Sequence, residues 1–304
     1  MALRITVDIF SGRPNPSVIV SGAEEEELLE RLSEPRRGRG AGEERSSRAP
    51  RIPEATLGYR GLIIERVETA AGRKRTRRGD LPDRVRVAAG YVLGERSRAT
   101  RDPGVEEWVL SPRGPIRLAG LGEEFSGRAA VEVDRFRHII DKWKWGKVKW
   151  PLRKICACAP LWEPGWWNDA GQVQWNNNCY NYGTNYRSDT YAQPGLAAGA
   201  MYGSITCAEV RAGAIADALI HSPKADNKCP KEGHLVALVV GPGWDFHWYR
   251  KGRNGYWTHK PGGTQATDRD NSGNLIPDPR TADRGGYTDF CTFMVVMHGH
   301  VKIR

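Results

Sequence analysis

The sequence of 304 residues contains no long hydrophobic run. A membrane-spanning helix needs about 18 or more consecutive apolar residues, and no stretch approaches that length. The first residues, MALRITVDIFSG, also lack the charged start and the apolar segment of a signal peptide. We therefore expect a cytoplasmic protein without a membrane span, which could leave the cell only by a non-classical export route.

Metal-binding cysteine patterns are also missing. The six cysteines include Cys156-Ala-Cys158, which is too tight for a Cys-x-x-Cys metal knuckle and has no matching second pair. In a chain of this size without a leader, cysteines are expected as thiols. The stretch from Asp268 to Asp278 resembles the start of a calcium loop, but Pro279 stands where the bidentate glutamate belongs. We expect neither a metal nor a cofactor.

Aromatic residues are absent from the most basic parts of the sequence. The net charge is +10, and much of it lies in residues 34–53 and 72–80. These runs are rich in glycine, serine or proline, or are interrupted by acids, which is typical of solvated loops. A platform for single-stranded nucleic acid would place aromatic residues among the charges. Nucleic acid is therefore an unlikely partner on composition alone.

Tryptophan divides the chain into two parts. Ten of the 11 tryptophans lie between Trp143 and Trp257. This shift predicts an accessory α+β domain with Arg-rich loops over residues 1–142, and a second domain over 143–304 that folds without the first. In the first domain, apolar periodicity and capping patterns predict helices over EEELLERL and 129–143, and strands over 4–10, 61–69, 84–93 and 106–110.

One cysteine in the second domain has the position of a nucleophile. Asn178 is a favoured N-cap residue, so Cys179 is expected at the first position of a helix that runs toward Tyr186. Free backbone amides at that position stabilise a thiolate, the reactive form of cysteine. Cys207 begins a second predicted helix after Thr206, but the alanine-rich stripe of that helix favours a packing role. An inert buried thiol is the alternative for Cys179.

Three histidines are candidates for the base that such a thiol needs. The segments HLVALVV, DFHWYRK and YWTHK read as consecutive strands. His247 shares a face of its strand with Asp245 and Tyr249, and a hairpin can bring it beside His259. His234 opens the preceding buried strand and is the other possible base.

These motifs resemble a known group of proteins. The segments NNNCYNYGTNY, DFHWYRKGRNGYWTHKPGG and DNSGNLIPDPRTADRGGYTDFC are similar to those of poorly characterised bacterial and phage proteins, over about residues 156–297. That group in turn resembles papain-like cysteine hydrolases of the NlpC/P60 and CHAP types. Thr258 stands where the group has serine, and Gly183 where it has alanine. The resemblance implies Cys179 as nucleophile, His247 as base and His259 as its orienting partner.

The sequence thus predicts an α+β protein whose second domain is papain-like, with a helix-borne cysteine packed on an antiparallel sheet. The predicted function is a cysteine peptidase or amidase acting on a peptide or peptidoglycan-like amide. A non-catalytic peptide- or glycan-binding module on the same fold is an alternative, as is a peptide-modifying acyltransferase. Oligomeric state and substrate identity stay open. The residues expected to contact substrate are Asn177, Asn178, Tyr182, Trp248 and Trp257.

Overall fold

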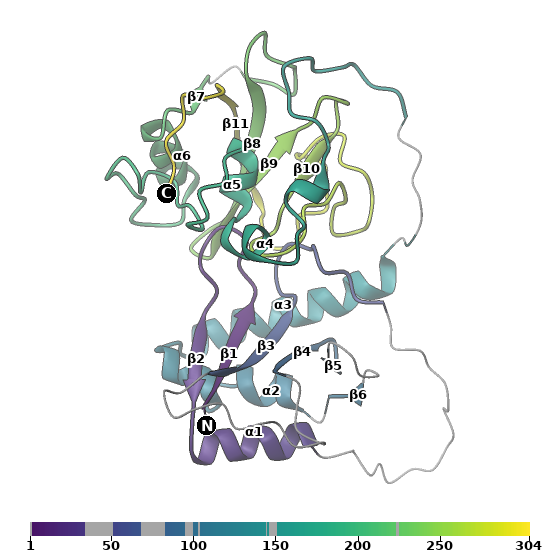
Figure 1. Cartoon of the computed structure of the whole chain (residues 1–304), viewed down its shortest axis with the longest axis vertical. Coiled ribbons are helices and arrows are strands. Elements are labelled where there is room, and N and C mark those ends of the chain that lie inside the picture. The colour runs from purple at the N-terminus through teal and green to yellow at the C-terminus, as the bar shows by residue number, and fades with distance from the viewer. Residues whose placement is uncertain are drawn as a thin grey trace. The chain divides into compact units, whose positions relative to one another are not determined.

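A computed structural model describes residues 2–33, 51–67, 83–94, 100–102, 104–143, 145, 151–222 and 225–304 (Figure 1). Residues 34–50 of the predicted basic loop over 34–53, and the whole predicted loop over 72–80, lie outside these residues. The chain divides into two compact units. The first contains residues 1–9, 15–53 and 59–141, and the second contains 10–14, 54–58 and 142–304. The second unit therefore includes two short segments from the early part of the chain.

The first unit has a six-stranded antiparallel sheet in the order β2-β1-β3-β4-β5-β6. Alternation along β1 sends Ile5 and Val7 into the core, where both are fully buried. The helix α3 contributes Phe136 to that core. The elements of this unit are β1 (Ala2–Asp8), β2 (Ser17–Val20), α1 (Ala23–Ser33), β3 (Gly61–Val67), β4 (Arg84–Ala88), β5 (Tyr91–Gly94), β6 (Thr100–Arg101), α2 (Val105–Leu110), the 3-10 helix η1 (Pro115–Ala119) and α3 (Glu123–Lys142).

Two predictions for the first unit need correction. The predicted strand over 84–93 is a hairpin, because Ala89 and Gly90 both adopt positive φ and turn the chain between β4 and β5. The predicted strand over 106–110 is the helix α2. The carboxylate of Asp102 accepts hydrogen bonds from the backbone N–H groups of Val105 and Glu106, so it satisfies the first donors of a helix whose N-cap is Gly104 and which strand periodicity did not reveal.

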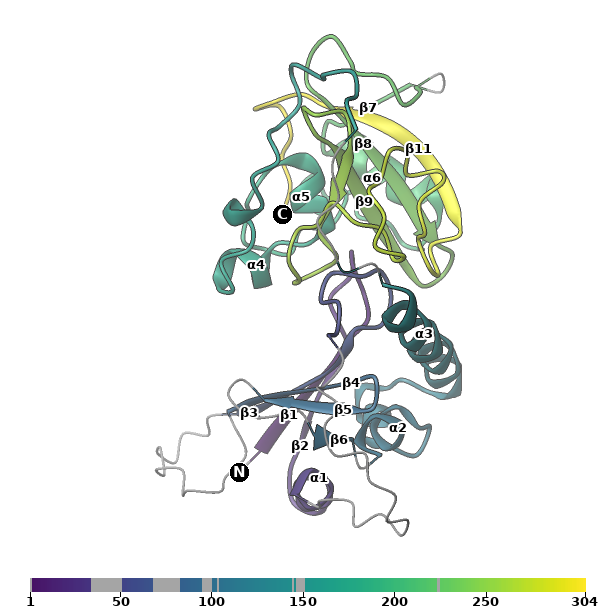
Figure 2. The same cartoon turned by 90° about the vertical axis from the view of Figure 1, so that its right-hand side faces the viewer.

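The second unit has a five-stranded antiparallel sheet in the order β10-β9-β8-β11-β7 (Figure 1). Figure 2 shows β7, β8, β9 and β11 of this sheet from the side. The strands predicted from HLVALVV, DFHWYRK and YWTHK are confirmed as β8, β9 and β10. Both units combine helices with an antiparallel sheet, so the α+β class is confirmed. The elements of this unit are η2 (Pro164–Trp166), α4 (Gln172–Asn176), α5 (Cys179–Thr184), α6 (Cys207–Ala216), β7 (Ile220–His221), β8 (His234–Gly241), β9 (Asp245–Lys251), β10 (Trp257–His259) and β11 (Asp289–Val296).

The two faces of this sheet carry separate apolar clusters. On one face, residues of α5 and α6 pack against side chains of β8 and β9, among them Leu238, Phe246 and Trp248. On the other face, Val239, Tyr249 and Trp257 belong to a second cluster. Because side chains alternate along β9, each of its residues can be assigned to one face. This assignment decides which predicted site residues can meet.

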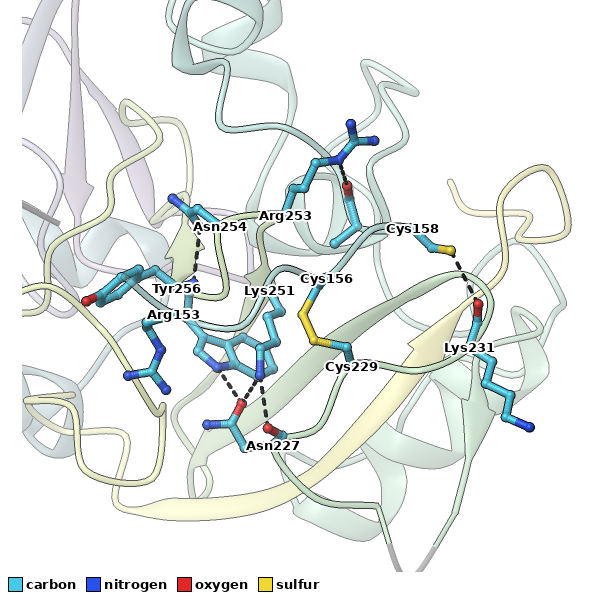
Figure 3. Close-up of a disulfide and its surroundings, with 12 residues drawn as sticks. Arg153, Cys156, Cys158, Asn227, Cys229, Lys231, Lys251, Arg253, Asn254 and Tyr256 are labelled. Atoms are coloured by element: carbon cyan, nitrogen blue, oxygen red, sulfur yellow. Dashed lines mark hydrogen bonds between the residues drawn. A yellow bond between two sulfur atoms is a disulfide. The ribbon is translucent and has the colours of Figure 1, made fainter. Parts of the chain in front are cut away.

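Four of the six cysteines form disulfide bonds, contrary to the expectation of thiols. Cys156 pairs with Cys229, as Figure 3 shows, and Cys207 pairs with Cys291. Cys207 is therefore excluded as a nucleophile in this state. The partners lie 73 and 84 residues apart, so their proximity depends on the tertiary fold and was not visible in sequence spacing. In the described part of the chain, no helix is long and apolar enough to cross a membrane.

Candidate functional site

The predicted cap of the cysteine-bearing helix is present. The side-chain oxygen of Asn178 accepts hydrogen bonds from the backbone N–H groups of Tyr180 and Asn181. The side chain of Asn181 accepts from the Asn178 N–H in return, which completes a capping box. Cys179 is therefore the first residue of α5, as predicted. The helix ends earlier than expected, because Asn185 adopts the left-handed conformation after Thr184.

Burial gives Cys179 a different chemistry from the predicted thiolate. Its side chain is fully buried, and its Sγ lies 4.0 Å from the carbonyl oxygen of Phe246. Removal from water raises the pKa of the thiol well above its ordinary value, and the nearby Asp245 carboxylate raises it further. The short helix does not offset this effect. Cys179 in this structure is a neutral, covered thiol.

The histidine pair forms as predicted, but on the opposite face of the sheet from Cys179. His247 Nε2 lies 2.9 Å from His259 Nδ1, and His259 Nε2 lies 2.8 Å from the carbonyl oxygen of Arg269. A carbonyl only accepts, so His259 carries its proton on Nε2 and accepts from His247. Phe246 and Trp248, the neighbours of His247 on β9, point toward α5. The structure therefore does not bring His247 to the thiol.

His234 shares the α5 face but serves another contact. Its Nε2 lies 2.8 Å from the carbonyl oxygen of Gly183, near the end of α5 and away from Cys179 at its start. Burial lowers the pKa of His234 to about 3, so the ring is neutral and cannot charge readily. This geometry favours a structural tie between β8 and α5 over a role as base.

The residues predicted to contact substrate are all buried. The Asn177 amide donates to Asp189 at 2.6 Å, and the Tyr182 hydroxyl lies 2.7 Å from that of Thr258. Trp257 donates from Nε1 to Asn227 Oδ1 at 3.0 Å. Asn177, Asn178, Tyr182, Trp248 and Trp257 each have 0% exposed surface. In this structure all five pack within the protein, and all except Trp248, whose Nε1 has no hydrogen-bond partner among the described residues, use their side chains in hydrogen bonds, so a substrate contact would require them to move.

The sequence did not reveal a site beside Cys179 that we call the amide-lined recess. It is formed by Asn178, Gln193, Tyr202 and Asp245. The carbonyl oxygen of Gly12 accepts hydrogen bonds from Asn178 Nδ2 at 2.8 Å and Gln193 Nε2 at 2.9 Å. The Tyr202 hydroxyl donates to Gln193 Oε1 at 2.6 Å, which fixes the orientation of that amide. The carboxylate of Asp245 accepts from the N–H groups on either side of Gly12. The glycine and the proline of SGRPN favour a turn, but nothing in their spacing places that turn beside Asn178.

Sequence reasoning also missed a cavity of about 540 Å³ near the end of α5, which we call the arginine pocket. Arg250 reaches it from β9, and Asn185 closes the helix beside it. The guanidinium of Arg187 lies 4.6 Å from the centre of the exposed Trp166 ring. The pocket is lined by Pro160, Leu161, Glu163, Trp166, Trp167, Asn185, Arg187, Arg250 and Arg253. The lining thus combines three cations and two indoles with one carboxylate.

Arg250 is the most unusual residue of the arginine pocket, because it is charged and 2% exposed. One Nη donates to Asn185 Oδ1 at 2.5 Å, and the guanidinium lies 3.9 Å from the centre of the Tyr182 ring. Its Nε has no hydrogen-bond partner in the described structure. Burial lowers the pKa of Arg250, although a guanidinium keeps its charge. Among the described residues, no carboxylate forms a salt bridge with Arg187, Arg250 or Arg253.

The calcium-like segment over residues 268–278 forms a hydrogen-bonded turn. The Asp270 carboxylate accepts hydrogen bonds from the backbone N–H groups of Ser272, Asn274 and Asp283, so it organises a turn. Within the residues the structure describes, no group of three or more histidine, cysteine or acidic side chains could hold a metal ion.

Comparison with known proteins gives one informative match. The chain is 45% identical over 142 residues to a protein called insoluble matrix shell protein 1 from Ruditapes philippinarum. The match covers 46% of this chain and 92% of the relative. The chain belongs to the family of that protein. No model of a known protein family matches the chain, and no solved structure matches it. The match to the shell protein does not bear on the resemblance to NlpC/P60 or CHAP enzymes.

Proposed function

We propose that the second unit is a non-catalytic binding module, and that its arginine pocket binds an anionic group carried on a sugar ring. The observation that carries this proposal is Arg250, a buried cation without a carboxylate partner among the described residues. The remaining features of the pocket decide what kind of anion fits.

Electrostatics favour an anion at this position. Burying a charge is costly unless it is paired and hydrogen-bonded, and the Nε of Arg250 is left without a partner. The Nε itself is covered by protein, so a carboxylate or sulfate would accept hydrogen bonds from the more exposed Arg187 of the same lining, whose guanidinium can offer two N–H groups to two oxygens. Arg187 and Arg253 add positive charge to the same cavity, against Glu163 alone.

The tryptophans favour a ligand with a flat face. Trp166 has 64% of its surface exposed beside the pocket, which is unusual for a large aromatic residue. Its indole can stack on a sugar ring while an arginine holds the acidic substituent. The name of the relative refers to an insoluble matrix, which is consistent with a module that binds matrix material. We therefore assign uronic-acid or sulfated glycans as the ligand class.

Calorimetric titration with an acidic and a neutral oligosaccharide tests the proposal. We expect a hyaluronan tetrasaccharide, which carries glucuronate, to bind and chitotetraose to bind at least about tenfold more weakly, a difference of about 1.4 kcal/mol. Arg187→Ala should weaken the acidic ligand, whereas Arg211→Ala on α6 should not. Equal affinity for both sugars, or equal effects of both variants, would refute a pocket that selects an acid.

A cysteine peptidase or amidase is the second candidate, and the amide-lined recess favours it. A helix-borne cysteine packed on an antiparallel sheet is the papain-like arrangement, and two amide donors on one carbonyl resemble an oxyanion hole. In this account His247 would have to reach the thiol from the far face. A fluorogenic peptide amide hydrolysed by the protein but not by Cys179→Ser would establish it, and no turnover would favour the binding module.

The disulfides lead us to propose an oxidising compartment in place of the expected cytoplasm. Structural disulfides persist outside the reducing cytosol. Protein isolated from its native source and denatured in the presence of a thiol-blocking reagent should show two blocked cysteines, Cys158 and Cys179, and two intact disulfides. Six blocked cysteines would restore the cytoplasmic assignment.

A further inference from the structure

Residues 10–14 lie in the amide-lined recess of the second unit as a bound peptide would. Three consecutive backbone N–H groups, from Ser11, Gly12 and Arg13, point at the carboxylate of Asp245. The closest of these contacts is 2.5 Å, from the Ser11 N–H. The Tyr287 hydroxyl donates to the same carboxylate at 2.6 Å. One buried carboxylate thus holds the main chain of the whole turn.

The carbonyl groups of the turn are held as specifically as its N–H groups. Asn178 and Gln193 donate to the Gly12 carbonyl, and the Gly262 N–H donates to the Ser11 carbonyl at 3.1 Å. Main-chain recognition of this kind accepts a peptide from any source that can adopt the same turn.

Two side-chain positions of the turn add selectivity. A Cβ built on Gly12 would lie 2.4 Å from the Phe246 ring, so only glycine fits without a displacement. Arg13 donates to the carbonyl oxygen of Trp244 at 2.7 Å, and its guanidinium lies 4.8 Å from the centre of the Phe10 ring. The recess therefore selects glycine followed by arginine.

We propose that this recess is a peptide-binding site for a Ser-Gly-Arg turn, and that residues 10–14 are its resident occupant and shield Cys179. Phe246, which Gly12 contacts, also supplies the carbonyl oxygen nearest to the Cys179 sulfur. Asn178, which holds Gly12, is the residue before Cys179 in the chain. Displacing the turn opens the path to the thiol, so the rate at which Cys179 is alkylated measures whether a peptide occupies the recess. This site is separate from the arginine pocket and does not depend on it.

Alkylation of the full-length chain tests the proposal. N-ethylmaleimide is added at pH 8, and mass spectrometry follows Cys179 with the exposed Cys158 as internal reference. Gly12→Ala should speed alkylation of Cys179 by about tenfold or more, because the new methyl group displaces the turn. Gly122→Ala is the matched control, since a Cβ there meets no atom within 4 Å.

Adding the turn as a free peptide tests recognition itself. Millimolar Phe-Ser-Gly-Arg-Pro-Asn should restore slow alkylation of Cys179 in Gly12→Ala, and the peptide with alanine in place of glycine should not. If circular dichroism shows that Gly12→Ala is unfolded, Asp245→Asn, which weakens the acceptor for the three N–H groups, takes its place. An unchanged Cys179 rate in the folded variant overturns the shielding, and failure of the peptide to protect overturns the binding site.

Discussion

At the scale of single residues, the reactivity of Cys179 depends on how deeply its side chain is buried, and its position in the sequence does not show this. Asn178 was predictable as a cap, and Cys179 follows it as expected. Sequence spacing carries no information on how much protein covers that cysteine. The fully buried side chain has a raised pKa where the helix start alone would have lowered it.

This contrast predicts the order in which the two free thiols react. In native wild-type protein, iodoacetamide at pH 8 should label Cys158, which is exposed and whose Sγ lies 3.3 Å from the Lys231 carbonyl (Figure 3), well before Cys179. The rates are expected to differ by at least about a hundredfold, because only opened molecules expose Cys179. Peptide mapping by mass spectrometry measures both. Labelling of Cys179 first would restore the activated nucleophile.

The buried histidine pair predicts a pH dependence of stability. Burial lowers the pKa of His259 from 6.5 to about 4, so between these values the unfolded chain binds a proton that the folded chain does not. This contribution to stability is present above pH 6.5 and is lost as the pH falls toward 4. For one proton the slope is about 1.4 kcal/mol per pH unit. Urea denaturation of His259→Gln between pH 4 and 7 should show a shallower slope than wild type.

An exposed histidine provides the control for this measurement. His300→Gln, a substitution at an exposed histidine, is measured beside it. Parallel curves for wild type and His259→Gln would mean that the His247–His259 pair takes up a proton without penalty.

At the scale of elements, strongly patterned segments were predictable and short or capped ones were not. The strands β8, β9 and β10 follow from continuous apolar and aromatic runs. The sequence predicted a strand where the helix α2 lies. This helix has only six residues, and the hydrogen bonds that Asp102 accepts from its first turn favour it more than its apolar periodicity does. In the candidate site, the sequence placed His247 beside His259 but could not show which face of the sheet α5 covers.

The N-cap residue of α5 should contribute more to the free energy of unfolding than the N-cap residue of α6. Asn178 accepts two backbone N–H bonds and donates to the carbonyl oxygens of Gly12 and Ala192, all in the interior. Asn178→Ala removes all four bonds and should lower the free energy of unfolding by about 3 kcal/mol. Thr206→Ala, at the more exposed cap of α6, should cost about 1 kcal/mol.

An isosteric variant separates the two roles of Asn178. Asn178→Asp keeps the oxygen that caps the helix but turns a buried carboxylate oxygen toward the carbonyl oxygens of Gly12 and Ala192, so its cost should be at least that of Asn178→Ala. Urea denaturation measures all three variants. Equal costs for Asn178→Ala and Thr206→Ala would show that the buried donated bonds contribute nothing.

At the scale of the whole molecule, contacts between residues far apart in the chain could not be predicted from the sequence. The composition shift placed a boundary near residue 142, close to where the second unit resumes. Nothing in the composition indicated that residues 10–14 and 54–58 also belong to that unit. A fragment beginning at 143 would leave the Asp245 carboxylate without the N–H groups of the turn. The disulfide pairs are equally non-local.

The bond between Cys207 and Cys291 should stabilise the protein measurably. It closes a loop across 84 residues and so restricts the unfolded chain by about 4 kcal/mol in the chain-entropy account. The double variant Cys207→Ser, Cys291→Ser should therefore unfold at a clearly lower urea concentration, while Cys158→Ser should unfold as wild type does. A double variant as stable as wild type would mean that this disulfide adds nothing.

A crystal structure of the full-length protein with bound hyaluronan tetrasaccharide would test the binding module most directly. We predict a glucuronate carboxylate within hydrogen-bonding distance of the Arg187 guanidinium, and a sugar ring stacked on the Trp166 indole. Density for the sugar elsewhere, or a carboxylate turned to solvent with the arginine pocket empty, would contradict it.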